Sequence, residues 1–167
     1  GTGRDTVTYA DSQASVSINL ADDTAEGLDA GSDSIVGFEN ATGGAGDDVL
    51  TGDAGDNILK GGDGDDQFTA AGGNDSIDGG AGTDSASFET ATAAVTVDLE
   101  AGTVETGPDT IEIEGVENIT TGSGDDVVTA DASDNEITTG AGDDIVEGGA
   151  GNDTLDGGAG VDKISFE

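Results

Sequence analysis

The sequence has neither of the two residue types that most often bind transition metals through sulfur or nitrogen. It contains no Cys and no His in 167 residues. A disulfide framework, a thiolate metal site and an imidazole general base are therefore excluded. The ligands that remain are the oxygens of carboxylates, amides, hydroxyls and backbone carbonyls, which suit hard cations such as Ca²⁺ and Mg²⁺.

Basic and aromatic residues are also scarce. Arg4, Lys60 and Lys163 face 38 Asp and Glu residues, which gives a net charge of −35, and aromatic residues make up 3% of the chain. Nucleic acid and anionic lipid are poor partners for this chain, because proteins bind them mainly through Lys and Arg. Such a composition predicts a chain that stays disordered until a cationic partner offsets its charge and its ordering entropy.

Long hydrophobic runs are missing as well. No apolar run approaches the ~20 residues of a membrane helix, and no signal peptide opens the chain. The chain has no Met and begins with Gly1–Asp5, in the middle of a repeat. We therefore expect no membrane insertion, and we expect flanking domains of a longer chain on either side of a monomeric module.

The chain contains an internal duplication. Gly80–Phe88 matches Gly1–Tyr9 at an offset of 79, and Asn118–Phe166 matches Asn40–Phe88 at an offset of 78. This predicts the end of a preceding repeat at 1–9, a first unit at 10–88 and a second unit at 89–167. We expect the units to form one continuous solenoid.

A shorter period of nine residues lies inside each copy. Five nonapeptides of the form G-G-x-G-x-D-x-U-x fill 43–87, and five more fill 121–165. Position six is Asp or Asn in every unit, position eight is apolar in every unit, and position four is Gly in all but one. The position-eight residues are Leu50, Leu59, Phe68, Ile77, Ala86, Val128, Ile137, Val146, Leu155 and Ile164.

Each position of the nonapeptide has a physical role. Glycines let a six-residue turn adopt positive φ and bring its carbonyls inward. The x-U-x segment is a three-residue strand whose middle side chain points to one face and whose neighbours point to the other. One such strand cannot bury its face alone, so the coils stack, with two nonapeptides per turn. The sequence predicts an all-β protein, a flattened solenoid of two parallel sheets.

The segments between the blocks keep part of this pattern. Gly37–Thr42 and Gly115–Thr120 read G-x-E-x-U-x and place Glu39 and Glu117 in the Asp position. Asp33 and Asp109 follow glycines in the same manner, a few residues out of register. Val95, Val104 and Ile113 are nine residues apart, which predicts further strand rows. A unit of 78 to 79 residues then fits eight rows plus a loop of six or seven residues, within 22–30 in the first copy.

Residues 61–69 (GGDGDDQFT) and 148–156 (GGAGNDTLD) resemble RTX, or hemolysin-type calcium-binding, repeats. The resemblance implies a right-handed parallel β-roll in which each Ca²⁺ lies between turns i and i+2 on the same edge. It also implies export by a type I secretion system, with folding outside the cell.

The resemblance also implies which residues bind calcium. Each pair of adjacent position-six residues on an edge would hold one ion, together with backbone carbonyls of the turns. One edge of the first block has Asp48, Asp66 and Asp84, and the other has Glu39, Asn57 and Asp75. The second block has Asp126, Asp144 and Asp162 on one edge, and Glu117, Asn135 and Asp153 on the other. The expected carbonyl ligands are Gly44, Gly46, Gly62, Gly64, Gly80, Gly82, Gly122, Gly124, Gly140, Gly142, Gly158 and Gly160.

The chemistry favours calcium, since six or more oxygens at about 2.3–2.6 Å suit Ca²⁺, whereas Mg²⁺ requires a stricter octahedron. Asn57 and Asn135 supply neutral oxygens, which predicts weaker sites there. The acids at position five, Asp47, Asp65, Asp125 and Asp143, are expected to face outward. Glu112 and Glu114 share one face of a strand without an acid or base opposite, so no catalytic residue is predicted.

These observations favour a structural and secretion module that folds on Ca²⁺ binding within a larger extracellular bacterial protein, and not an enzyme. Two alternatives remain. One is a carbohydrate-binding accessory module of an extracellular polysaccharide-modifying enzyme. The other is a spacer in an adhesin or surface layer.

Overall fold

The computed structural model of the chain describes residues 2–166, which form two β-sheets and contain no helix. The ten-stranded sheet has the order β1 (Thr6–Thr8), β5 (Asn40–Thr42), β7 (Ile58–Asp63), β9 (Ser76–Ala81), β13 (Asp109–Glu114), β12 (Thr103–Thr106), β11 (Val95–Asp98), β15 (Val127–Thr129), β17 (Ile145–Glu147) and β19 (Lys163–Ser165). The nine-stranded sheet has the order β18 (Thr154–Asp156), β16 (Glu136–Thr138), β14 (Asn118–Thr120), β10 (Ser85–Ser87), β8 (Gln67–Thr69), β6 (Val49–Thr51), β2 (Val16–Asn19), β3 (Thr24–Gly27) and β4 (Gly31–Ser34).

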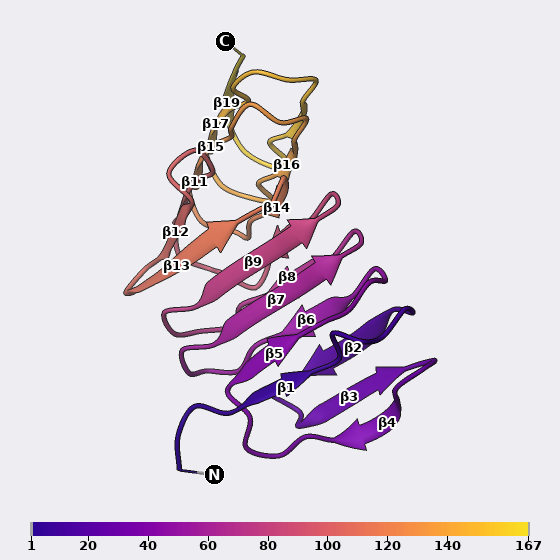
Figure 1. The fold of residues 1–167 in the computed structure, drawn as a ribbon. Coiled ribbons are helices and arrows are strands. Elements are labelled where there is room, and N and C mark those ends of the chain that lie inside the picture. The colour runs from indigo at the N-terminus through magenta and orange to yellow at the C-terminus, as the bar shows by residue number, and fades with distance from the viewer. Residues whose placement is uncertain (1, 167) are drawn as a thin grey trace.

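The chain winds between the two sheets, one nonapeptide to each sheet (Figure 1). Strands 18 residues apart pair in parallel, as Leu50 does with Phe68 and Leu59 with Ile77. Two nonapeptides therefore make one coil, as the sequence predicts. The fold is an all-β parallel β-roll, and this prediction is confirmed.

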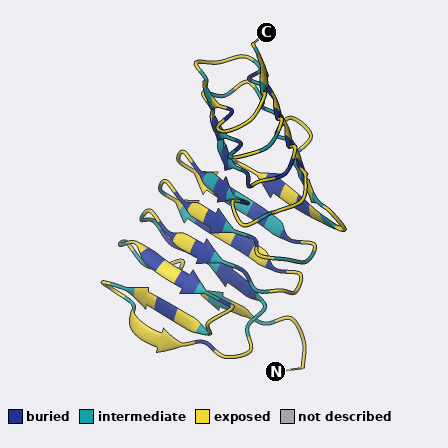
Figure 2. Ribbon diagram, turned by 180° about the vertical axis from the view of Figure 1, so that it is seen from behind, coloured by how far each residue is buried: buried dark blue, intermediate teal, exposed yellow. Residues whose placement is uncertain are grey.

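The core is a thin layer between the sheets, built from the position-eight side chains. Leu50, Leu59 and Ile137 are fully buried at 0% exposure, whereas Val49 and Ile58, one residue earlier, are 40% and 37% exposed. Buried and exposed residues accordingly alternate along the strands (Figure 2). The alternation follows from the strand geometry, which turns successive side chains to opposite faces.

The segments between the nonapeptide blocks contain antiparallel strands, which corrects the prediction of eight successive rows. β11, β12 and β13 form an antiparallel meander in which Val97 faces Val104 and Val104 faces Ile111. Val95, Val104 and Ile113 are nine residues apart without forming parallel rows. The expected loop at 22–30 likewise contains a strand, β3, which pairs with β2 and β4 in the same manner. A strand and its reversing turn happen to span nine residues, so the spacing of inward apolar residues is the same in both arrangements.

The meanders lie in different sheets in the two copies. In the first copy β2, β3 and β4 belong to the nine-stranded sheet, and in the second copy β11, β12 and β13 belong to the ten-stranded sheet. Leu50 therefore lies in the nine-stranded sheet, although its equivalent Val128 lies in the ten-stranded sheet. Equivalent turns of the two copies consequently lie on opposite edges of the roll.

The inward row supplies a test of this core. Leu59→Ala removes a fully buried side chain between Ala41 and Ile77, so we expect a loss of about 2–5 kcal/mol in the free energy of unfolding. Ile58→Ala, the adjacent residue on the outer face, is expected to lose less than half as much. Both are measured by denaturant unfolding in excess calcium, and equal losses would contradict the assignment of the core face.

Candidate cation-binding turns

Eight of the ten position-six side chains are buried at the edges of the roll, where the chain passes from one sheet to the other, and Asp153 and Asp162 are partly exposed. Asp48, Asp66, Asp84, Asp126 and Asp144 are all at most 1% exposed. Burying a carboxylate is costly unless hydrogen bonds or a counter-charge compensate it. The partners of these oxygens therefore determine what the turns can bind.

One oxygen of each carboxylate joins two neighbouring coils. Asp66 Oδ1 accepts a hydrogen bond from Asp48 N at 2.7 Å, and Asp84 Oδ1 accepts one from Asp66 N at 2.8 Å. Asp144 Oδ1 does the same for Asp126 N at 2.7 Å. These three bonds connect residues 18 apart, whereas Asp48 Oδ1 and Asp126 Oδ1 accept from Val16 N and Val95 N, 32 and 31 residues away. The first oxygen is thereby committed to holding successive coils in register.

The second oxygen of several of these residues has no protein partner. Oδ2 of Asp66, Asp75, Asp84 and Asp144 is buried without a hydrogen bond, as is Oδ1 of Asn135. A buried acceptor left without a partner costs about 1–3 kcal/mol, and more when it is charged. Four carboxylate oxygens in this state indicate that the turns fit a bound cation.

A backbone carbonyl of the next coil faces the same point. Gly61 flanks the free Oδ2 of Asp66, and a Cβ on Gly61 would lie 2.6 Å from the carbonyl oxygen of Gly79 and would also clash with Asp66 Oδ2. Gly79 stands in the same relation to Asp84 Oδ2 and the carbonyl oxygen of Gly115. Glycine at position one thus leaves open a cradle between a carboxylate and a carbonyl oxygen, the donor types that Ca²⁺ prefers.

The turns that leave a carboxylate oxygen free share a backbone conformation. Gly62 and Gly64 in the turn 61–66 have φ of 125° and 114°, as expected from the sequence. In the turn 70–75, Ala71 occupies position two and has φ of 70°, which a residue with a Cβ rarely adopts. Ala71 therefore shows that the turn requires this conformation even where glycine is absent.

The free carboxylates have altered acidity. Burial raises the pKa of Asp66 to about 7, although the backbone hydrogen bond from Asp48 opposes the shift, and the neighbouring charges of Asp48 and Asp84 add to it. Burial likewise raises the pKa of Asp75 to about 6 and raises the pKa of Asp84. A bound divalent cation would favour the ionised form of each.

The predicted ligands fall on the two edges in an order that the sequence did not show. The first edge, whose turns lead into the nine-stranded sheet, continues from Asp84 to Glu117, because Glu117 Oε2 accepts Asp84 N at 2.8 Å. The first edge carries Asp48, Asp66, Asp84, Glu117, Asn135 and Asp153. The second edge, whose turns lead into the ten-stranded sheet, carries Glu39, Asn57, Asp75, Asp126, Asp144 and Asp162.

Asp33 and Asp109, the two acids that follow glycines a few residues out of register with the nonapeptides, have different environments. Asp33 lies on the exposed strand β4, where its Oδ2 accepts the Tyr9 hydroxyl, and it joins no turn. Asp109 begins β13 and its Oδ2 lies 3.4 Å from Gly73 N, beside the turn that holds Asp75. The carbonyl of Gly115 and the carboxylate of Asp109 were not identified from the sequence as groups near a cradle, because only the folded chain places them there.

The acids at position five face outward, as expected. Asp47, Asp65, Asp125 and Asp143 are exposed, and each accepts a backbone N–H from the coil 18 residues later. Within residues 2–166 no three carboxylates converge on one point. Any ion in these turns therefore depends on one or two carboxylates together with backbone carbonyls.

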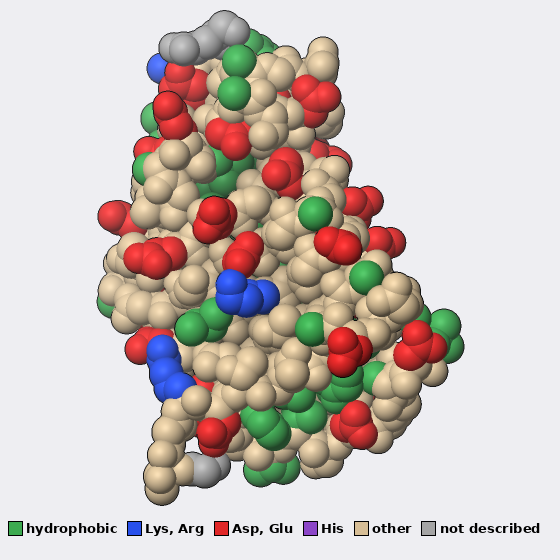
Figure 3. Space-filling model, viewed as in Figure 1, with side chains coloured by type: hydrophobic (Ala, Val, Ile, Leu, Met, Phe, Trp, Pro, Cys, Tyr) green, Lys and Arg blue, Asp and Glu red, His purple; other side chains and the backbone are tan. Residues whose placement is uncertain are grey.

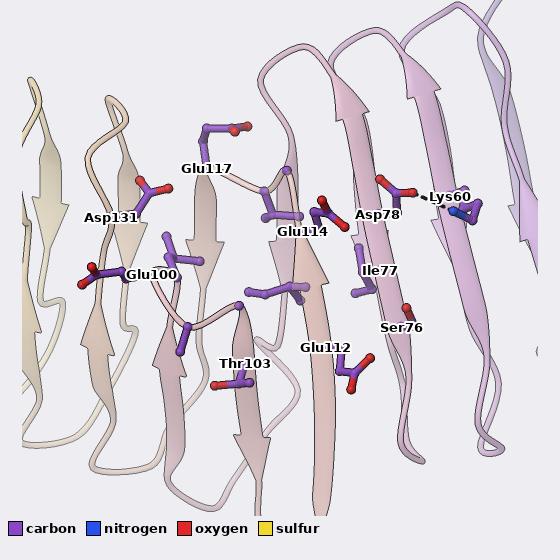
Figure 4. A pocket seen from close by; sticks show the side chains of 16 residues that line it. Lys60, Ser76, Ile77, Asp78, Glu100, Thr103, Glu112, Glu114, Glu117 and Asp131 are labelled. Atoms are coloured by element: carbon purple, nitrogen blue, oxygen red, sulfur yellow. Dashed lines mark hydrogen bonds and ion pairs between the residues drawn. The ribbon is translucent and has the colours of Figure 1, made fainter.

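Glu112 and Glu114 line an open hollow on the outer face of the ten-stranded sheet (Figure 4). Glu100, Glu117 and Asp131 line it too, so acids do lie opposite, which corrects that part of the sequence interpretation. Lys60, at its margin, forms an ion pair with Asp78 at 2.7 Å.

Together these features define a cation-binding parallel β-roll, in which buried carboxylates and backbone carbonyls of successive coils face each other. The sequence profile of the RTX calcium-binding nonapeptide repeat matches four copies in this chain, at residues 36–68, 51–86, 114–146 and 138–166. The chain belongs to this family and is a calcium-binding β-roll module. No curated protein matches the chain.

The raised pKa values predict how the metal-free chain responds to pH. Asp66 and Asp75 have folded pKa values of about 7 and about 6 against an ordinary value of 3.8, so the folded state binds more protons than the unfolded state between these limits. Their contribution to stability is complete below about pH 4 and is lost as the pH rises to about 7.

We therefore expect the β-sheet circular dichroism of the calcium-free protein to decrease from pH 4 to pH 7, and excess calcium to restore it at pH 7. A signal that is constant or increases over this range without calcium would contradict the assignment. Asp66→Asn should make the decrease in the circular dichroism signal between pH 4 and pH 7 smaller, because an amide does not titrate.

Proposed function

We propose that this chain is a calcium-gated folding module of a larger secreted bacterial protein. In this proposal it stays unfolded in the calcium-poor cytosol, passes through a type I secretion system, and condenses into the β-roll outside the cell. The observation that carries the proposal is the set of buried, unpartnered Asp oxygens, of which those of Asp66 and Asp84 face carbonyls of the next coil. Contacts between coils are incomplete until a cation occupies them.

The overall charge supports a dependence on cations. Acidic side chains are spread over the face shown in Figure 3, with few basic ones among them. Arg4 and Lys60 form ion pairs with Asp56 at 3.6 Å and with Asp78 at 2.7 Å, all on partly exposed side chains. Exposed pairs of this kind contribute about 0–1 kcal/mol each. The chain's three basic residues are therefore too few to offset its 38 Asp and Glu residues, and a net charge of −35 remains.

Calcium binding is large enough to decide whether the chain folds. An ion at a free concentration 100 times its Kd stabilises the folded state by about 2.7 kcal/mol. Small domains are stable by only about 5–15 kcal/mol, so a few such ions account for the whole difference between folded and unfolded chain. Several ions bound along two edges would make folding a steep function of calcium concentration.

The proposal includes the organisation of the chain. We infer one continuous solenoid from two 79-residue units, because both sheets run through both copies. The module is expected to act as a monomer between flanking domains and to have no catalytic activity of its own. Residues 2–166 contain no helix long and apolar enough to cross a membrane. Phe68 and Phe88 are 2% and 6% exposed, so these aromatic rings serve the core and not a sugar-binding surface.

Calcium titration tests the proposed function directly. The calcium-free chain at pH 7 should show the circular dichroism of a disordered chain and should elute from a size-exclusion column earlier than a folded protein of its mass. Added calcium should convert it to a compact β protein in one steep transition. Magnesium at the same concentration should fail, because it dehydrates reluctantly and requires a regular octahedron. Unchanged β structure after complete calcium removal at pH 7 would exclude calcium-gated folding.

A pair of substitutions tests the ligand assignment. Asp66→Asn keeps the shape and the acceptor for Asp48 N but removes the charge from the buried turn. We expect the calcium concentration at the folding midpoint to rise on the order of tenfold, since charge-assisted interactions contribute about 1.5–3 kcal/mol. Asp65→Asn, the exposed neighbour that bonds Thr83 N at 2.8 Å, removes the same charge and should change the midpoint less than about twofold. Equal shifts in the two variants would show that overall charge, and not ligation at Asp66, sets the affinity.

A further inference from the structure

The two copies of the repeated unit meet differently on the two edges of the roll. On the second edge the hydrogen bonds of the position-six side chains lead from Asn57 N to Asp75 Oδ1, and they begin again at Asp126, whose Oδ1 accepts Val95 N at 2.8 Å. The three antiparallel strands β13, β12 and β11 lie between these places in the ten-stranded sheet. On this edge no two position-six side chains are therefore neighbours across the copies.

On the first edge the connection between the copies is unbroken. Glu117 Oε2 accepts Asp84 N at 2.8 Å, just as Asp84 Oδ1 accepts Asp66 N at 2.8 Å within the first block. The strands that follow, β10 and β14, pair in parallel. Asn135 Nδ2 donates to the carbonyl oxygen of Glu117 at 2.7 Å and continues the connection into the second block. The first edge thus joins the position-six residues of both copies.

The three-residue turn Gly115–Glu117 presents the same groups as a complete nonapeptide turn. Within the block, the free Oδ2 of Asp66 lies beside the carbonyl oxygen of Gly79. At the junction, the Oδ2 of Asp84 is free as well, and a Cβ on Gly79 would lie 2.5 Å from it and would also clash with the carbonyl oxygen of Gly115. Gly115 has φ of 62°, which a residue with a Cβ rarely adopts. The short turn therefore brings a carbonyl and a carboxylate of the second copy to a buried carboxylate of the first.

No basic side chain compensates the two acids at this junction. Asp84 is 1% exposed, and Lys60, in the adjoining hollow, is paired with Asp78 instead (Figure 4). Burial raises the pKa of Asp84 most, the backbone hydrogen bond from Asp66 opposes the shift, and the charge of Glu117 is the first of the neighbouring charges that add to it. Two carboxylates and a carbonyl without a counter-charge suit a divalent cation, and their donor types are those that Ca²⁺ prefers.

We propose that a calcium ion binds at this junction, to Asp84 Oδ2, the Gly115 carbonyl and the Glu117 carboxylate, and makes the two copies fold as one unit. The inference rests on the proposed function, since it gives one ion of the calcium-binding roll the role of joining the copies. The site is complete only when both copies are folded, because each contributes ligands. Binding at this site therefore stabilises the two copies together.

Glu39 provides a natural comparison at the other end of the first copy. Its Oε2 accepts Asp5 N at 2.8 Å, and its carbonyl oxygen accepts Asn57 Nδ2 at 2.8 Å, so it repeats the contacts of Glu117. Glu39 does not lie between the two copies. Any effect of Glu117 on the coupling of the copies should consequently be absent at Glu39.

The first test counts bound calcium by equilibrium dialysis at a calcium concentration that saturates the wild type. Glu117→Gln keeps an acceptor for Asp84 N but removes the charge, and it should bind one ion fewer. Glu114→Gln removes the same charge from an exposed residue at the end of β13 and should leave the count unchanged. An unchanged count in Glu117→Gln, or an equal loss in both variants, would overturn the junction site.

The second test follows the two copies separately, by hydrogen-exchange mass spectrometry of peptides from 43–87 and from 121–165 at increasing calcium. Leu59→Ala weakens the core of the first block, and it should raise the calcium concentration at which both blocks become protected. Combined with Glu117→Gln, it should raise that concentration for the first block only. Combined with Glu39→Gln, it should still shift both blocks. If both blocks also shift together in the Glu117→Gln background, strand pairing couples the copies and the inference is wrong.

A crystal structure of the wild type grown with calcium decides the question even if Glu117→Gln does not fold. An ion is expected about 2.3–2.6 Å from Asp84 Oδ2 and from the Gly115 carbonyl oxygen. Ions in the nonapeptide turns with none at the junction would overturn the inference and leave the proposed function intact. No calcium in any turn would overturn the proposed function as well, so the two failures are distinguishable.

Discussion

The contact on which this fold depends most is the buried carboxylate between two coils. In the turn 61–66, one oxygen of Asp66 accepts a hydrogen bond from Asp48 N of the previous coil, and the other faces the Gly79 carbonyl of the next coil. A single side chain thus joins three successive turns on an edge. Because each coil contacts only its neighbours, the stability of the roll is set by a repeated local interaction, and in the proposed function a cation completes that interaction.

The apolar core is too thin to replace this contact. Each strand contributes one inward residue, and the size of that residue varies along a row, as from Phe68 to Ala86 to Ile119 in the nine-stranded sheet. Rows of this kind tolerate such variation because the register is held at the edges by hydrogen bonds 18 residues apart. In the proposed function it is therefore the charged edges, and not the core, that make folding depend on calcium.

The second copy is shifted by half a coil relative to the first, so equivalent turns lie on opposite edges of the roll. The first edge runs from Asp84 directly to Glu117, whose longer side chain reaches Asp84 N although its turn is shorter than a nonapeptide turn. The same arrangement occurs at the start of the chain, where Glu39 Oε2 accepts Asp5 N at 2.8 Å. A Glu in place of Asp thus allows a shortened turn to keep the hydrogen bond between the side chain and the backbone N–H of the previous coil. The Asn residues 18 positions later belong to the same arrangement, which the sequence analysis read only as weakened ligands.

The nine-residue period by itself determined the parallel β-roll, the inward position-eight row and the place of Asp48, Asp66 and their equivalents in the turns, because strand alternation and stacking leave few other ways to bury one apolar residue in nine. It could not determine the direction of β12 or β3, since Val95, Val104 and Ile113 face inward at the same spacing in a coil and in a meander. Nor could it show which oxygens stay free. Thr121, Asn57 and Gly115 act on groups that are distant in sequence, and only the tertiary structure brings those groups within hydrogen-bonding reach.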